Sequence, residues 1–239
     1  MSIKDLAQKV VPKSIEQAAR DYVYNRNCRL KPSQYREALE KWYRFSKGVD
    51  PHLDNPQTLG EKMQWLKLYD ATPEKGKLAD KYLVREWVAD KIGEDCLIPI
   101  LGAWDRPEDI WWNRLPERFV LKATHGSGWN VVVKDKSKLD IENVVRKFNR
   151  WLPRRMAMSG GFEMHYEYCE PRIIAEQYME DSSGGLRDYK FITFYGDVQF
   201  VLAIEGRFTD EVSVTYMPDW SPAPFRLSLI HISEPTRLR

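Results

Sequence analysis

A lysine followed closely by a glycine-containing loop is the strongest chemical feature of the sequence. In RFVLKATHGSGWNVVVK, residues 118–134, a predicted strand ends in Lys122, a loop follows, and a second strand returns. The loop holds His125, Gly126, Ser127 and Gly128. Glycines let backbone N–H groups approach an anion closely, and the lysine supplies a compact positive charge. In a P-loop, by contrast, the lysine follows the glycines and opens a helix. Taken alone, an ordinary glycine hairpin with a surface lysine is the simpler interpretation.

A second segment, residues 171–191, offers groups that suit a flat heterocycle and its ribose. A predicted apolar strand leads into Glu176, Gln177, Tyr178 and Met179, and a serine- and glycine-rich loop separates them from Asp188 and Lys190. Such a strand presents backbone donors and acceptors beside apolar side chains, an acidic residue accepts from ribose hydroxyls, and a lysine binds a phosphate. In isolation, a hairpin with solvated charges again explains the pattern.

The elements that must position these residues change in type near Leu97. The first ninety or so residues predict helices, whereas short strands follow. A capping box at Ser14 begins the first predicted helix, whose apolar positions are Ile15, Ala18, Ala19, Tyr22 and Val23. The second covers residues 33–47, with Leu39, Trp42 and Phe45 on one side and Gly48 at its end. A capping box of Thr58 and Glu61 begins the third, with Leu59, Met63, Leu66 and Tyr69 facing inward, and the fourth covers residues 78–92.

Six predicted strands lie within residues 97–205, interrupted by one helix that Asp140 caps. The stripe of that helix comprises Ile141, Val144, Val145, Phe148 and Leu152. In DVQFVLAIE, residues 197–205, apolar positions alternate after a Tyr-Gly-Asp turn, which predicts an antiparallel hairpin.

Composition excludes several classes of protein. The 239 residues are 43% hydrophobic, and 37 basic against 35 acidic residues leave a net charge of +2. This favours a folded chain and gives no overall reason to expect nucleic-acid binding. No apolar run approaches the roughly 18 residues of a membrane span, and the N-terminus lacks the apolar core of a signal peptide. The scattered Cys28, Cys96 and Cys169 predict reduced thiols in the cytoplasm.

The C-terminal segment LSLIHISEPTR, residues 227–237, resembles a translated sequencing adapter. We therefore expect residues 227–239 to be an adapter-derived tail and the natural chain to be interrupted near Arg226. A genuine short C-terminal strand and tail is the alternative.

Together, the two chemical segments resemble the ATP-grasp fold, and residues 55–226 resemble its TupA-like family. Six blocks carry this resemblance in order: TLGEKMQWLKLYD, ADKYLVREWVADKIGEDCLIPILGAW, FVLKATHGSGWNVVVKDKSKLDIE, PRIIAEQYMED, LRDYKFITFYGDVQF and RFTDE. The resemblance implies an α+β fold with a helical N-terminal region (1–96), an antiparallel-sheet nucleotide-binding lid (97–175) and an incomplete C-terminal subdomain (176–226). It also implies an ATP-dependent carboxylate–amine ligase of bacterial cell-surface polysaccharide synthesis, of the teichuronopeptide type, which forms an acylphosphate from ATP, a carboxylate-bearing sugar or polysaccharide precursor and an amino donor.

The resemblance further implies roles for individual residues. Lys122 would hold the ATP phosphates under the flap 126–128, with Lys81 as a second basic contact. Glu176 would meet the adenine amino group, and the backbone of Gln177 and Met179 would lie at the adenine edge beside Tyr178. Asp188 would contact the ribose and Lys190 a phosphate. His125 would contact the transferred phosphate, and Arg207 would bind the acceptor carboxylate or acylphosphate. A structural histidine and a solvated arginine are the alternatives for His125 and Arg207.

The sequence departs from the family pattern after Arg226. The family places acidic and asparagine ligands for Mg²⁺ on later strands, so we expect the chain as printed to bind nucleotide weakly and to be inactive. A glycosyltransferase and a noncatalytic polysaccharide-binding module remain alternative functions, although the DxD motif typical of many glycosyltransferases is missing from the sequence.

Three other groups of residues favour structural roles. Trp104, Trp111 and Trp112 indicate core or domain packing rather than a sugar platform. The basic cluster of Arg146, Lys147, Arg150, Arg154 and Arg155 indicates a solvated helix face rather than a contact with an anionic polymer. His165 and Cys169 lack a second pair of ligands, which makes a metal site there a weak hypothesis.

Overall fold

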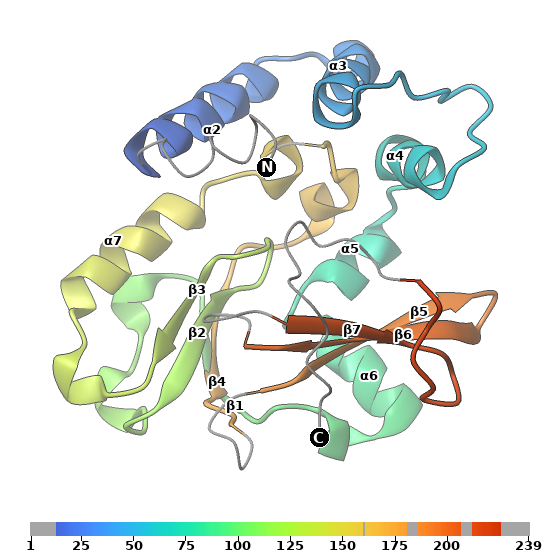
Figure 1. The fold of residues 1–239 in the computed structure, drawn as a ribbon. Helices are drawn as coiled ribbons and strands as arrows, with labels where there is room; N and C mark the ends of the chain where they lie inside the picture. Colours follow the sequence, from blue (N-terminus) through green and yellow to red (C-terminus); the bar gives the residue numbers. More distant parts are fainter. Residues whose placement is uncertain (1–12, 160, 181–185, 207–211, 226–239) are drawn as a thin grey trace. The chain divides into compact units, whose positions relative to one another are not determined.

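Two antiparallel sheets, one in each of two compact units, form the frame of the protein (Figure 1). The computed structural model describes residues 13–159, 161–180, 186–206 and 212–225. The units are Met1–Tyr178 and Met179–Arg239. The class is α+β, as the sequence predicts. The four-part division expected from the sequence stays a prediction.

The sheet of the first unit has the strand order β1-β4-β2-β3, and all its pairs are antiparallel. Its strands are β1 (Ile100–Trp104), β2 (Phe119–Ala123), β3 (Asn130–Val133) and β4 (Ile173–Gln177). Because β4 lies between β1 and β2, a strand from late in the sequence separates the first two strands. The two segments that the sequence singled out therefore meet side by side on β2 and β4.

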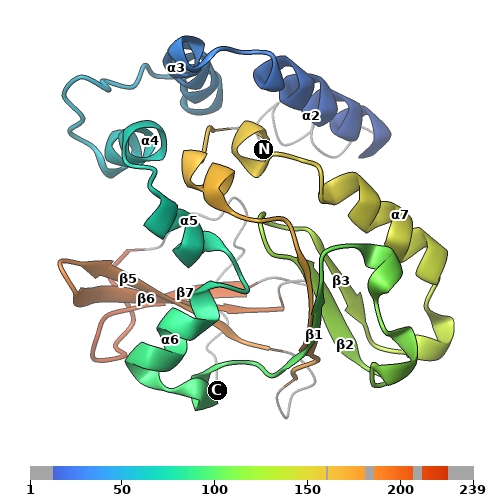
Figure 2. The same cartoon turned by 180° about the vertical axis from the view of Figure 1, so that it is seen from behind.

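Burial alternates along β2, so one face of the strand lies in the core and the opposite face is only partly covered. Phe119, Leu121 and Ala123 are buried, whereas the alternating Val120 and Lys122 are only partly buried. The core residues pack against Val144 and Phe148 of α7 (Ile141–Trp151), which Figure 2 shows beside the sheet. Burying one such side chain contributes about 1.5–3 kcal/mol. Asp140 caps α7 by accepting from the Asn143 backbone N–H at 2.9 Å, as predicted.

Among the described residues of the first unit, five helices precede this sheet. They are α2 (Lys13–Cys28), α3 (Tyr35–Lys47), α4 (Leu59–Tyr69), α5 (Pro73–Ala79) and α6 (Val84–Ile92). Short 3₁₀ turns link the elements: η1 (Pro32–Gln34), η2 (Glu94–Cys96), η3 (Pro107–Asp109), η4 (Trp112–Arg114), η5 (Lys136–Lys138), η6 (Met156–Met158) and η7 (Met164–Tyr168). Gly48 ends α3 in the left-handed conformation with φ 76°, where glycine pays no steric cost.

Residues from beyond the first ninety complete the helical core. Leu39 and Leu53 pack with Ala157, Met158 and Phe162. The Asn27 side chain donates to the Met158 carbonyl at 3.1 Å. The chain after α7 therefore returns to the helices before it enters β4.

Two arginines of the predicted solvated basic cluster form ion pairs with distant parts of the chain. Arg154 pairs with Asp21 at 2.6 Å and lies over the ring of Tyr24, and Arg155 pairs with Glu167. Arg154 is partly buried in its contacts, so for this residue the prediction of a solvated face is wrong, whereas Arg155 is exposed.

The predicted inward stripe of α4 is also wrong. Leu59, Met63, Leu66 and Tyr69 are about half exposed, whereas Glu61 and Gln64 are buried. The Glu61 carboxylate accepts backbone N–H groups of His52, Gln57 and Thr58 at 2.9–3.0 Å, and these bonds lower its pKa to about 2. This set of charge-assisted hydrogen bonds, which includes the predicted capping box with Thr58, decides which side of α4 faces inward.

Other expected positions differ in a similar way. Ile15 and Tyr22 on α2 are exposed, whereas Tyr24, Asn27 and Cys28 of the same helix face the core, and Phe45 on α3 is 87% exposed. Core packing is confirmed for Trp104 and Trp112, but Trp111 is exposed, with the Arg114 guanidinium over its ring at 4.8 Å.

The second unit holds a three-stranded antiparallel sheet in the order β5-β6-β7. Its strands are β5 (Asp188–Phe194), β6 (Asp197–Glu205) and β7 (Val212–Tyr216). The predicted hairpin is confirmed, and positive φ angles of 53° at Tyr195 and 90° at Gly196 form its turn. Residues 201–204 are all buried, so both faces of β6 are covered along this stretch.

The remaining general expectations concern cysteines and membranes. Cys28, Cys96 and Cys169 are free thiols, as predicted. Among the helices formed by the described residues, none combines the length and the apolar character that crossing a membrane requires.

Candidate functional site

Lys122 and Glu176 lie on the face of the first sheet that is turned away from α7. Val120 pairs with Glu176 in the register of β2 and β4, and Lys122 pairs with Ile174, so Lys122 and Glu176 are diagonal neighbours. The Lys122 ammonium donates to Glu176 Oε2 at 2.5 Å. Glu176 is 6% exposed, which makes it a buried carboxylate that needs cationic partners.

Arg85 of α6 is the second cation beside Glu176. Its Nη1 lies 3.9 Å from Glu176 Oε1, and its Nη2 donates to the Ile98 carbonyl at 2.7 Å. The backbone contact holds the guanidinium in place before β1. The two carboxylate oxygens of Glu176 therefore face different cations.

Lys81 reaches the site because the predicted helix over 78–92 is broken. The buried Asp80 side chain accepts from the backbone N–H groups of Tyr82 and Leu83 at 2.8 and 3.0 Å, which separates α5 from α6. Short local bonds of this kind compete with a continuous helix. In the interruption, the Lys81 ammonium donates to the carbonyls of Thr124 and Gly126.

The environment of Lys81 is unusually unfavourable for a charge. Burial lowers its pKa from the usual value of 10.5, and the positive charge of Lys122 lowers it further. The nearby carboxylates of Asp80 and Glu176 oppose this shift. The two predicted lysines thus approach each other closely enough to interact, although they lie 41 positions apart in the sequence.

Two glycines shape the loop between β2 and β3 for different reasons. A side chain at the buried Gly126 would meet the Trp129 ring at 2.5 Å, so residue 126 must be small. Gly128 is exposed and has φ 77°, with open space where a side chain would stand. The loop therefore needs close packing at the first glycine and left-handed backbone at the second. Ser127 between them is exposed.

Thr124 anchors the beginning of this loop to the chain before β4. Its hydroxyl donates to the Glu170 carbonyl at 3.0 Å and accepts from the Arg172 N–H at 3.2 Å. Its own N–H donates to the Arg172 carbonyl at 2.9 Å. The loop base is therefore fixed, while residues 127 and 128 extend into solvent.

His125 is buried within the loop rather than presented to solvent. It is 3% exposed, and its ring lies 5.0 Å from that of Trp129. Within the described residues, neither ring nitrogen has a hydrogen-bond partner at normal geometry. Burial lowers the pKa of His125 and Lys81 lowers it further, against the opposing effect of the nearby backbone carbonyls of Trp151 and Arg154. The structure thus shows neither a phosphate-facing histidine nor one with a satisfied structural hydrogen bond, and the predicted role of His125 stays a prediction.

The other predicted residues lie farther along the chain. Gln177 is exposed and its N–H donates to the Pro99 carbonyl at 3.0 Å, while the half-buried Tyr178 has the Arg118 guanidinium 4.9 Å from its ring centre. Met179 begins the second unit, and Asp188 and Lys190 lie on β5 within that unit. Arg207 lies outside the described residues. Of the predicted set, the structure brings together Lys81, Lys122, Glu176, His125 and Gly126.

Three residues of the site were missed by the sequence analysis. Asp80 and Arg85 flank Lys81 in the block ADKYLVREW, and Thr124 directly precedes His125. Asp80 lies inside the predicted helix over 78–92, and an aspartate can form an Asx turn with the backbone N–H two residues later, a signal that could have revealed the helix break. Nothing local marks Arg85 or Thr124, since their partners lie far away in sequence.

A metal site was weighed for His165 and Cys169. In the part of the chain that the structure describes, no group of three or more histidine, cysteine or acidic side chains is placed to hold a metal ion. Cys169 instead donates to the Gly76 carbonyl at 3.3 Å, and burial raises the pKa of its thiol to about 12.

Comparison with known proteins adds one result to this geometry. Residues 61–234 match the family model described as TupA-like ATPgrasp. The matched range extends past Arg226, and the origin of the tail stays a prediction. The comparison with curated proteins and the comparison with solved structures each gave no match.

Proposed function

The chain belongs to the TupA-like ATP-grasp family, and from this premise we propose that the first sheet binds ATP on the face that carries Lys122 and Glu176. The observation that carries the proposal is the convergence of two lysines on one glycine-containing loop. Lys81 bonds the carbonyls of that loop, and Lys122 ends the strand that leads into it. Two closely spaced cations beside a small-residue loop suit a polyphosphate better than a single carboxylate.

Glu176 is the proposed contact for the adenine amino group. Its carboxylate pairs with Lys122 and Arg85, and a carboxylate accepts hydrogen bonds but donates none. Such a group accepts from the amino group of adenine and repels the carbonyl oxygen that guanine carries at the same place. The proposed site therefore prefers ATP to GTP. In the free protein, the same carboxylate occupies Lys122, so nucleotide binding must redistribute this ion pair.

The proposed reaction is ATP-dependent joining of a carboxylate to an amine. The γ-phosphoryl group passes to the carboxylate oxygen and ADP leaves; the amine then attacks the acyl carbon and inorganic phosphate leaves. Family membership supports this class of chemistry, with a carboxylate-bearing sugar or polysaccharide precursor as acceptor and synthesis of the cell surface as its setting. A cytoplasmic location belongs to the same proposal. The proposed roles of Asp188, Lys190 and Arg207 in binding ribose, phosphate and acceptor are also part of it.

The described residues do not fit a Mg²⁺ site at this face. Glu176, the carboxylate of this face, is engaged by Lys122 and Arg85, and the described residues form no cluster of three candidate ligands. Mg²⁺ prefers several oxygen ligands in octahedral geometry. We therefore assign no residue of the described part to the metal that ATP-grasp enzymes use.

Nucleotide choice tests the proposed function directly. The midpoint of thermal unfolding is measured for the 239-residue chain with ATP, GTP, UDP-glucose or no ligand. A rise with ATP that exceeds the rise with GTP supports the proposal. A rise with UDP-glucose alone would favour a glycosyltransferase, and no rise with any nucleotide would favour a binding module. Amine-dependent release of ADP then tests turnover.

A further inference from the structure

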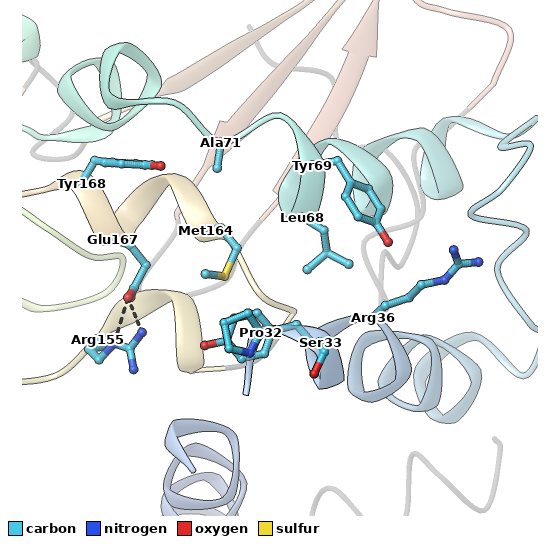
Figure 3. Close-up of a pocket in the computed structure, with 11 residues that line it drawn as sticks. Pro32, Ser33, Arg36, Leu68, Tyr69, Ala71, Arg155, Met164, Glu167 and Tyr168 are labelled. Atoms are coloured by element: carbon cyan, nitrogen blue, oxygen red, sulfur yellow. Dashed lines mark hydrogen bonds and ion pairs between the residues drawn. The ribbon is translucent and has the colours of Figure 1, made fainter. Parts of the chain in front are cut away.

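A cavity of about 650 Å³ lies in the helical part of the first unit, and none of the residues proposed for ATP lines it. Its walls come from the turn before α3, the end of α4 and the segment 155–168 (Figure 3). The volume falls within the range of small-molecule sites, roughly 300–1,000 Å³. The three wall segments are far apart in sequence, so folding of the whole helical core is needed to form the cavity.

The cavity combines an apolar centre with an aromatic residue at each end. Leu68, Met164 and Pro32 line the middle, whereas Tyr69 and Tyr168 lie at opposite ends (Figure 3). Both tyrosines are about half exposed. Apolar and aromatic surfaces of this kind accept the C–H faces of a ring, and each tyrosine adds a hydroxyl group.

The polar groups of the cavity occur as paired charges. Arg155 donates twice to one oxygen of Glu167, Oε2, at 2.9 Å from Nε and more closely from Nη2. Tyr35, which also lines the cavity, interacts with the same guanidinium, so groups of the protein already engage Arg155. Arg36 at the other end is held by Glu40 and by a bidentate pair with Asp54. Both cations that line the cavity are thus already neutralised by carboxylates.

We propose that this cavity binds one neutral saccharide ring. The hydroxyl groups of Tyr69 and Tyr168 match the hydroxyl groups of a sugar, and the apolar centre matches the C–H surface of the same ring. Paired arginines select against an anion, because an anionic ligand would compete with Glu167 and Asp54 for cations that they already satisfy. The proposal therefore distinguishes a neutral sugar from a uronic acid or a phosphate. It does not rest on ATP binding at Lys122.

Tyr168 in the wall of the cavity also contacts α5, the helix that precedes Lys81. Tyr168 packs directly on Gly76 of α5, where an added side chain would collide with it, and Lys81 follows shortly after α5. Cavity and lysine site are therefore two features of one unit that can be examined separately in the same protein.

Titration of the full chain with methyl β-glucoside and methyl β-glucuronide, followed by amide NMR shifts, tests the proposal. We expect saturable shifts of residues 69 and 164–168 with the glucoside and at least about tenfold weaker binding of the glucuronide. Lys122→Ala should leave the glucoside affinity unchanged, which separates this site from the proposed function. Absence of saturable shifts at these residues, or preference for the glucuronide, would overturn the proposal.

A pair of variants gives a sharper test. Glu167→Gln removes one carboxylate and leaves Arg155 without its anionic partner, so the preference should reverse toward the glucuronide. Glu163→Gln is the matched control, since Glu163 pairs with Lys67 and does not line the cavity. Tyr69→Leu should weaken glucoside binding about fivefold by removing the aromatic face. If Glu167→Gln and Glu163→Gln retain the same preference as the unmodified chain, the assigned role of the Arg155–Glu167 pair is wrong.

Discussion

Lys122 and Glu176 form a diagonal cross-strand pair in which the ammonium and the carboxylate of the proposed nucleotide site neutralise each other at 2.5 Å. The pair keeps two buried charges compatible with folding before any ligand arrives. A phosphate that binds Lys122 must compete with Glu176. The affinity for nucleotide therefore reflects the difference between two free energies, that of the Lys122–phosphate contact and that of the Lys122–Glu176 contact it replaces.

Removing the Lys122 ammonium should weaken ATP binding. Lys122→Ala removes a charge-assisted contact worth roughly 1.5–3 kcal/mol, so we expect an affinity about 10- to 150-fold lower by calorimetric titration. Lys134→Ala is the control, because Lys134 is an exposed lysine just after β3. Equal ATP affinities of the two variants would remove Lys122 from the site.

Arg85 should act as a positioning residue for Glu176. Arg85→Met removes the ion pair with Glu176 and the hydrogen bond to Ile98, and we expect an ATP affinity about 5- to 30-fold lower. The preference for ATP over GTP should fall at the same time, which a general loss of stability would not cause. The exposed neighbour Glu86 provides the control variant Glu86→Gln. A weaker affinity with an unchanged ATP-to-GTP ratio would contradict this role.

Nucleotide binding should be linked to protonation of Lys81. Burial and Lys122 lower the pKa of Lys81 in the free protein, and a bound phosphate would raise it again. At pH values above the free pKa, binding must therefore take up a proton, and the ATP affinity should decrease as the pH rises. Titrations in two buffers of different ionisation enthalpy measure this uptake. Lys81→Met should abolish the uptake; if it persists in that variant, another group is responsible.

Stability in mild acid should depend on His125. Burial lowers its pKa below the ordinary value of 6.5, so the unfolded chain binds the additional proton as the pH falls toward and below that value. The free energy of unfolding should therefore decrease with falling pH in this range. His125→Phe removes the titrating group and should flatten the dependence between pH 7.5 and 5.5 in urea unfolding. His52→Asn, at an exposed position, is the comparison, and an equal flattening there would argue against His125.

Gly76 should tolerate no side chain. Its added methyl group would collide with the Tyr168 Cβ and approach the His165 carbonyl at 3.0 Å, so Gly76→Ala should destabilise the fold by about 1–3 kcal/mol. Gly60→Ala is the matched helical control, where the nearest atom is the movable Tyr43 hydroxyl at 2.9 Å. If the two variants unfold at the same urea concentration, the contact between α5 and η7 is looser than described.

Local patterns in the sequence predicted much of the secondary structure. The capping box at Thr58, the cap at Asp140 and the glycine turn after β5 each depend on neighbouring residues, and all three are present. Strand β7 was missed, although its residues VSVTY alternate and are mostly β-branched. The side of each helix that is buried was less predictable, because contacts with residues distant in sequence determine it. Glu61 turns α4 through bonds to a preceding loop, and the return of residues 156–162 determines which parts of α2 and α3 are covered.

The same distinction applies to the site. Lys122 and its loop could be recognised because strand, lysine and glycines follow one another in sequence. The pairing of Lys122 with Glu176 required the register of β2 against β4, and the approach of Arg85 required the fold between α6 and β1. Burial of His125 depends on Trp129, four residues later, whose ring covers it.

The break between α5 and α6 at Asp80 also determines the directions in which the side chains of Lys81 and Arg85 point. In one continuous helix, Lys81 and Arg85 would be i, i+4 neighbours on the same face, with Cβ atoms about 5–6 Å apart and their charges in mutual repulsion. Because the helix stops at Ala79 and restarts at Val84, Lys81 turns to the carbonyls of the loop while Arg85 turns to Ile98 and Glu176. One buried aspartate thereby converts a repulsive neighbouring pair into two cations that serve different contacts.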